Sequence, residues 1–96
     1  MSPSEWEAAK GSGEYRAASL ADEGFIHCSF EDQLDAVLRR YYSGAGSLNV
    51  LEIDPVRLTA ELVEEPSTND EIYPHIYGPL NIDAVVGVSK MEAPEE

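Results

Sequence analysis

The sequence predicts a single α+β domain with a small, mostly antiparallel sheet and helices near the N-terminus. Two observations support this fold class. Apolar residues recur at helical spacing over residues 30–41, and short strand-like runs follow in the second half of the chain. Because the helices come before most of the strands instead of alternating with them, an antiparallel sheet is favoured. The 96 residues contain no internal repeat and suit one domain with one core.

The first helix is expected to begin near Ser2 and to end before Gly13. Ser2 suits a helix N-cap, Pro3 suits a first helical position, and glycine ends helices readily. A loop over residues 14–23 then leads into a short strand at residues 25–28. Strand alternation places Phe25 and His27 on one face of this strand, and its other two residues on the opposite face.

The second helix is expected to begin with Ser29 as its N-cap. Its apolar stripe consists of Phe30, Leu34, Val37, Leu38 and Tyr41. The remaining strands are predicted at residues 48–53, 59–64, 73–77 (interrupted at Pro74) and 82–88. Asp54–Pro55 and Gly78–Pro79 are typical of turns between them.

Charge and composition restrict the classes of partner. Nineteen acidic residues against six basic ones give a formal net charge of −13, which repels nucleic acids and anionic membrane surfaces. Either a salty cytoplasm or an ordinary acidic surface explains this excess. No apolar run is long enough to span a bilayer. Cys28 is the only cysteine, and a free thiol suits a cytoplasmic protein.

The two histidines are the strongest candidates for site chemistry. His27 and His75 each lie in an apolar segment punctuated by glycine or proline, where a neighbour sets the pKa and tautomer of an imidazole. His27 is a candidate to hold a ligand hydroxyl or to act as a general base. His75 has Tyr77 beside it, which offers a further hydroxyl. The alternative for both histidines is a packing role in the core.

Four further residues are weaker candidates. Ser29 opens a helix whose free backbone amides suit an anion, although a capping role alone is the simpler explanation and the one we favour. Arg16 and Ser19 precede the His27 segment, and Arg16 is the cation nearest to it in sequence. Arg16 is therefore a candidate to bind a phosphate or carboxylate, although a surface ion pair with Glu14 or Glu23 explains it equally well. Glu65 lies ten residues before His75 and is a candidate to orient a histidine or a sugar.

We predict no metal site and no catalytic thiol. His27 and Cys28 are adjacent on a strand, so their side chains diverge and cannot easily share an ion. For the same reason Cys28 should point away from His27, and it is interpreted as a small buried hydrophobe.

Several segments together resemble the bacterial domain of unknown function family 952. The resemblance covers nearly the whole chain and is most specific in Gly24–Ser29 and Pro74–Leu80. It implies a distant kinship with ADP-ribosyltransferase-like folds, which bind NAD in a cleft between two small sheets, so NAD or ADP-ribose is the implied cofactor. Glu65 resembles a glutamate that the family places at the end of a strand. The resemblance implies no established activity.

The chain departs from this family at its beginning. Members usually open with a histidine-containing strand before the tryptophan-containing helix, whereas this sequence begins at Met1 directly before that helix. An unfilled sheet edge would result, and such an edge favours pairing with a second copy as a homodimer.

Three functional classes follow from these residues. The first is an ADP-ribosyltransferase-like enzyme, and the second is a non-catalytic binder of a nucleotide or sugar phosphate. The third is a structural or interaction domain that forms a homodimer. The first two require His27 and His75 to lie on one wall of a pocket with Ser29 and Tyr77 nearby, whereas the third does not.

Overall fold

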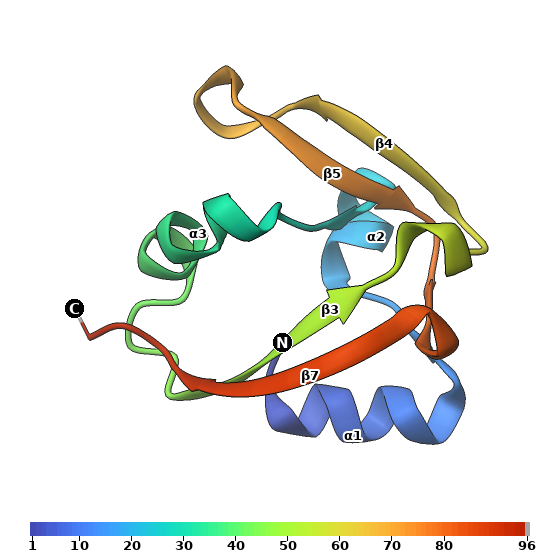
Figure 1. Ribbon diagram of the computed structural model, residues 1–96, viewed down its shortest axis with the longest axis horizontal. Coiled ribbons are helices and arrows are strands. Elements are labelled where there is room, and N and C mark those ends of the chain that lie inside the picture. Colours follow the sequence, from blue (N-terminus) through green and yellow to red (C-terminus); the bar gives the residue numbers. More distant parts are fainter. Residues whose placement is uncertain (96) are drawn as a thin grey trace.

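The computed structural model describes residues 1–95 and confirms the α+β class. Every strand pairing is antiparallel, but the strands form three small sheets, β1–β6, β2–β5–β4 and β3–β7, and not one. In Figure 1 the β4–β5 hairpin lies at the top, the long β3–β7 ribbon crosses the lower half, and α1 lies beneath it. The elements are α1 (Pro3–Ser12), β1 (Glu14–Tyr15), α2 (Ala18–Glu23), β2 (Ile26–His27), α3 (Leu34–Tyr41), β3 (Ser47–Ile53), β4 (Glu61–Pro66), β5 (Ile72–Tyr77), β6 (Leu80–Asn81) and β7 (Val85–Glu92).

The first helix follows the sequence prediction closely. The Ser2 hydroxyl accepts a hydrogen bond from the Glu5 amide, and the Glu5 carboxylate accepts one from the Ser2 amide. These reciprocal bonds form a capping box and satisfy two amides that the helix leaves free. Gly13 ends the helix in the left-handed conformation at φ 88°, which glycine adopts without steric cost.

The prediction of a loop over residues 14–23 is wrong, because this segment contains β1 and α2. The helix α2 has only six residues, and its N-cap, Ala17, makes no side-chain capping bond. Its C-terminal end is better marked, since Gly24 has φ 89° and donates its amide to the carbonyls of Ser19 and Leu20. A helix this short carries too few apolar repeats for periodicity to reveal it.

The second predicted helix begins later than expected, and Ser29 is not its N-cap. A 3₁₀ turn at Glu31–Gln33 precedes α3, and Phe30 occupies the N-cap position of that turn. The Gln33 side chain caps it by accepting a hydrogen bond from the Phe30 amide at 2.9 Å. The same side chain donates to the Ile72 carbonyl, which joins the helix start to β5.

The strand β5 continues through Pro74 without the predicted interruption. Proline has no N–H to donate and normally avoids central strands. Here the Pro74 carbonyl accepts from the Cys28 amide, so the backbone of Pro74 faces β2, which is only two residues long. The missing donor therefore costs one bond at the end of a short ladder.

The last strand also begins later than predicted. Residues Ile82–Ala84 form a 3₁₀ turn, and β7 follows from Val85. Ala84 is fully buried, and its carbonyl accepts the Asp54 amide, which fixes this turn against the segment that follows β3.

The main core lies on one face of the β2–β5–β4 sheet. Ile26, Ile76, Leu80 and Ala84 are buried together, and Leu51 and Ile53 of β3 pack against them. Register places Ile26, Ile76 and Leu62 opposite one another across the three strands, on a single face. The other face of this sheet carries polar side chains.

Candidate functional site

The second face of the β2–β5–β4 sheet holds both histidines. His27 of β2 and Val63 of β4 are the direct register partners of His75 on β5, so the three share one face. Alternation along β5 adds Tyr73 and Tyr77 to it. Imidazole and phenol groups therefore occupy the side of the sheet opposite the apolar core. We call His27, His75, Glu65, Tyr77, Phe25 and Glu23 the histidine cluster.

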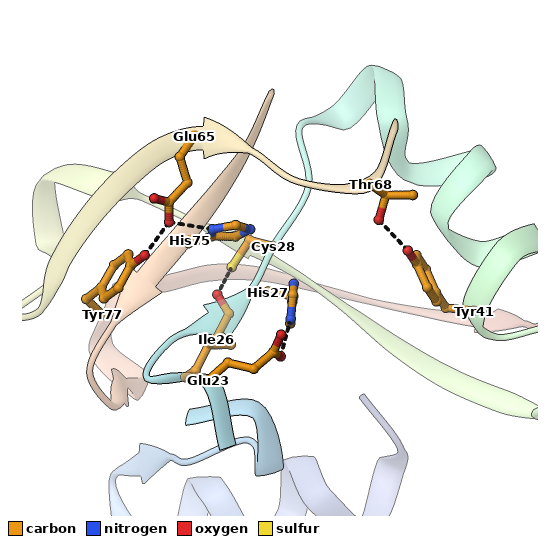
Figure 2. A network of polar contacts seen from close by, with 9 residues as sticks. All are labelled: Glu23, Ile26, His27, Cys28, Tyr41, Glu65, Thr68, His75 and Tyr77. Carbon is orange, nitrogen blue, oxygen red and sulfur yellow. Dashed lines mark hydrogen bonds and ion pairs between the residues drawn. The ribbon is translucent and has the colours of Figure 1, made fainter. Parts of the chain in front are cut away.

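Glu65 joins His75 to Tyr77 through a single carboxylate oxygen. Its Oε2 lies 2.7 Å from Nδ1 of His75 and 2.5 Å from the Tyr77 hydroxyl, which donates to it. Figure 2 shows the carboxylate between the two rings. The sequence prediction that Glu65 orients His75 therefore has the required geometry, although the two residues come from different strands.

The shared carboxylate shifts the pKa values of its neighbours. The hydrogen bond from Tyr77, followed by the one from His75, holds the pKa of Glu65 below its ordinary value. In turn, the bond to Glu65 raises the pKa of Tyr77. Glu65 is thus a carboxylate and Tyr77 a neutral phenol at neutral pH.

This carboxylate also sets the tautomer of His75. An ionised carboxylate only accepts hydrogen bonds, so Nδ1 of His75 must carry a proton, and Nε2 of the neutral ring carries the lone pair. His75 is only 2% exposed, and its Nε2 has no hydrogen-bond partner within residues 1–95. A buried polar atom without a hydrogen-bond partner costs about 1–3 kcal/mol. Such atoms are therefore rare in native structures.

His27 is bound to a different carboxylate. Its Nε2 lies 2.7 Å from Oε2 of Glu23, at the end of α2, and its side chain is 49% exposed. The centroids of the His27 and His75 rings are 5.3 Å apart, in an edge-on arrangement. The two imidazoles therefore converge as the sequence analysis required, one exposed and one buried.

Phe25 contacts three members of the cluster with one ring. It stacks on His75 with centroids 4.1 Å apart, and lies 4.9 Å from His27 and 5.2 Å from Tyr77. Strand alternation had placed Phe25 on the His27 face, which is confirmed. The ring of Phe25 covers a flat side of His75 and contributes to its burial.

The remaining predicted residues lie apart from these contacts. Arg16 forms an ion pair with Glu14 and borders a hollow of about 590 Å³ between α1 and β1. Ser19 lies in α2, where its carbonyl accepts the Gly24 amide. Ser29 follows β2 and is partly buried, and the capping role expected of it is taken by neighbouring residues.

Glu23 is the member of the cluster that the sequence analysis missed as a site residue. It had been considered only as an ion-pair partner of Arg16. The usable signal was its spacing, four residues before His27, combined with Gly24, whose left-handed conformation turns the chain back sharply enough for the two side chains to meet.

Cys28 takes no part in the cluster. It packs against the apolar core on the opposite face of β2, and burial raises the pKa of its thiol to about 11. Such a thiol is almost entirely protonated at neutral pH and a poor nucleophile. Among residues 1–95, no group of three or more His, Cys, Asp or Glu side chains is arranged to hold a metal ion.

A second, smaller hollow of about 260 Å³ lies on the β3–β7 ribbon and includes Asn49 and Lys90. Neither this hollow nor the one beside Arg16 is lined by a member of the histidine cluster. Within the described part of the chain, no helix combines the length and apolarity that a membrane crossing requires.

Comparison with solved structures finds the same architecture in protein CC0527 from Caulobacter crescentus. Its crystal structure matches with a TM-score of 0.82 and 29% sequence identity, covering 96% of this chain and 80% of that chain. The solution NMR structure of CC0527 gives the same values, and a crystal structure of its double variant has 28% identity. A search of curated proteins found no match. Residues 1–88 match the model of the family described as "Protein of unknown function (DUF952)", and the chain therefore belongs to this family.

Proposed function

We propose that the histidine cluster binds the hydroxyl groups of a nucleotide or sugar phosphate, as a small-molecule enzyme of the ADP-ribosyltransferase-like type or as a binder that leaves its ligand unchanged. The observation that carries this proposal is Nε2 of His75, which is buried, held in direction by the contact of Nδ1 with Glu65, and without a hydrogen-bond partner among residues 1–95. A ligand hydroxyl is the group that would satisfy this acceptor.

The proposed ligand contacts follow from the chemistry of the cluster. A hydroxyl donates to Nε2 of His75, and the exposed His27 ring meets a second hydroxyl of the same sugar. The Phe25 ring stacks on the His75 imidazole, so this ring must move aside for the ligand to reach His75. In an enzyme, His75 then acts as a general base whose proton gain is stabilised by the Glu65 carboxylate.

The kinship with ADP-ribosyltransferase-like folds that the family resemblance implies suggests NAD or ADP-ribose as the ligand, and we assign the cluster to the ribose of either molecule. Carboxylate, imidazole and phenol groups suit neutral hydroxyls, which both donate and accept hydrogen bonds. Glu23 and Glu65 are unfavourable neighbours for a phosphate. The proposal therefore assigns the cluster to the sugar and places any phosphate away from these carboxylates.

A structural role is the second candidate, and one observation favours it. Asn49 of β3 exchanges two backbone hydrogen bonds with Met1, on the edge opposite β7, and Met1 is the only one of residues 1–95 that pairs there. An open edge of this kind favours pairing with a second copy. In that case the histidines pack the sheet, and the protein is a homodimer at micromolar concentration.

The test uses variants that separate binding from folding. Replacing His75 with asparagine keeps a donor in the position of Nδ1 for Glu65 but removes Nε2, so the fold should survive while ligand binding is lost. Glu7→Gln is a suitable control, because Glu7 is an exposed residue of α1 that pairs with Lys10. Thermal shift measurements with NAD, ADP-ribose, ribose 5-phosphate and ribose would identify ligands, since a ligand at a hundredfold its Kd stabilises by about 2.7 kcal/mol.

A ligand that stabilises the wild type and Glu7→Gln but not His75→Asn would support the proposal. Product formation from that ligand, followed by NMR, would identify an enzyme, and an unchanged ligand would identify a binder. If none of the four compounds binds while light scattering shows a dimer, the structural candidate replaces the proposal.

A further inference from the structure

We propose that the histidine cluster selects a sugar linked to a positively charged aromatic ring, an N-ribosyl pyridinium, over the same sugar linked to a neutral ring. This inference rests on the proposed function, because it assumes that His75 holds the sugar. It adds the charge of the ligand, which hydroxyl contacts alone do not decide, and it gives Glu23 a part in specificity.

The two carboxylates of the cluster have no basic side chain as a partner. Glu23 lies 2.7 Å from the His27 ring. Glu65 serves His75 and Tyr77. The ion pairs that lysine and arginine form among residues 1–95 involve other carboxylates, those of Glu7, Glu14, Asp35 and Asp54. No lysine or arginine in the described part of the chain therefore neutralises Glu23 or Glu65, and their charge attracts a cation.

A continuous series of contacts joins these carboxylates through three aromatic rings. Glu23 contacts His27, whose ring centroid is 4.9 Å from that of Phe25. The Phe25 centroid is in turn 5.2 Å from that of Tyr77, which donates to Glu65. Figure 2 shows the two pairs of ring and carboxylate. The His27 side chain is 49% exposed and Tyr77 is 40% exposed, so a ligand can contact both rings.

The rings of the cluster are also free of basic side chains. The face of an aromatic ring carries negative charge and attracts a cation. The cation–π contacts found within residues 1–95 are on other rings, with Lys10 over Trp6 and Arg40 over Tyr41. A cation over Phe25, His27 or Tyr77 must therefore come from the ligand.

The surroundings favour an organic cation over a metal ion. Among residues 1–95 the carboxylates and imidazoles form no group that could hold a metal. A pyridinium is flat and spreads its charge over a ring, so it can stack on aromatic side chains.

The position of His75 links this ring to the sugar. Its buried Nε2, without a partner among residues 1–95, is the proposed acceptor for a sugar hydroxyl. The His75 centroid is 4.1 Å from that of Phe25 and 5.3 Å from that of His27. A ring bonded directly to the sugar therefore lies against the aromatic members of the cluster.

The test uses two probes that differ in charge. Nicotinamide riboside and its dihydro form share the ribose and differ by one hydride, so only the first is a cation. Glu23→Gln removes one carboxylate charge from the cluster and keeps an oxygen that accepts a hydrogen bond from His27. Glu7→Gln is the matched control, because it removes the same charge from an exposed residue of α1. Calorimetry at low and high salt measures the affinities.

The wild type should bind nicotinamide riboside about tenfold or more tightly than the dihydro form. Glu23→Gln should reduce this preference severalfold, because it weakens binding of the charged probe more than binding of the neutral one. Glu7→Gln should retain the preference of the wild type. High salt should lower the preference in the wild type, since it screens the carboxylates.

The outcomes separate failure of this inference from failure of the proposed function. Equal affinity of the wild type for the two probes, with binding lost in His75→Asn, refutes selection by charge and leaves the sugar site standing. A preference that Glu23→Gln retains in full refutes the part given to Glu23. If the wild type binds neither probe, or if His75→Asn binds both as well as the wild type does, the assignment of the cluster to the sugar is refuted as well.

Discussion

Substituting Gly78 with alanine should destabilise the fold strongly, because the site depends on a close approach of two backbones at this position. A Cβ atom added at Gly78 would lie 2.8 Å from Cβ of Ala60. Carbon atoms in contact are normally about 3.5–4.0 Å apart, so the new methyl group is about 1 Å too close. The obstacle is the short side chain of the residue just before β4, which cannot rotate away. Overpacking of this kind costs about 1–3 kcal/mol.

The assay is thermal and urea unfolding of Gly78→Ala beside Gly87→Ala. A loss of about 2 kcal/mol should lower Tm by roughly 8–16 °C in a domain of this size. At Gly87 the added Cβ meets Cβ of Glu52 at 3.5 Å, an ordinary contact, so this control should remain within about 0.5 kcal/mol of the wild type. Equal unfolding free energies for the two variants would refute the reasoning. Because Gly78 follows Tyr77, the first variant should also weaken ligand binding.

Three other predictions concern stability, pH and reactivity. Burial raises the pKa of Cys28 from 9.0 to about 11, so iodoacetamide should label this single cysteine at pH 8 roughly a hundredfold more slowly than an exposed thiol; a half-maximal rate near pH 9 would contradict the burial argument. The pKa of Glu65 is lowered in the folded state, so its contribution to stability is present above its ordinary pKa and is lost as pH falls through the folded value. The difference in unfolding free energy between wild type and Glu65→Gln should therefore shrink as urea titrations move from about pH 6 to about pH 3, and a constant difference would argue against it. Finally, His27→Ala should cost less than about 1 kcal/mol and His75→Ala about 2–4 kcal/mol, because the first side chain is half exposed and the second is buried; similar losses in calorimetry would show that the two histidines have the same role.

The sequence predicts the parts of this fold that depend on local chemistry. The N-cap at Ser2, the glycine end of the first helix and the alternation at Phe25 and His27 all follow from neighbouring residues, and each is found in the structure. The start of α3 was misplaced because a 3₁₀ turn precedes the helix, and the Gln33 side chain accepts a hydrogen bond from the Phe30 amide at the start of that turn. Likewise, Pro74 continues a strand because its partner strand ends there, which only the pairing reveals.

The candidate site was likewise predicted where residue type and local segment are sufficient, and was missed where the position of a residue in the fold decides. Both histidines, Glu65 and Tyr77 were identified from residue type and segment, and the structure brings them together. Arg16 was chosen because it is near His27 in sequence, yet it pairs with Glu14 beside β1.

The single oxygen of Glu65 that serves both Tyr77 and His75 has an evolutionary consequence. The two donors share the negative charge of one acceptor oxygen, so removing the Tyr77 hydroxyl should strengthen the remaining bond to His75. The energetic cost of changing one of these residues then depends on the identity of the others. Positions 65, 75 and 77 should accordingly be inherited as a set, and a homologue that lacks one member should have altered the other two.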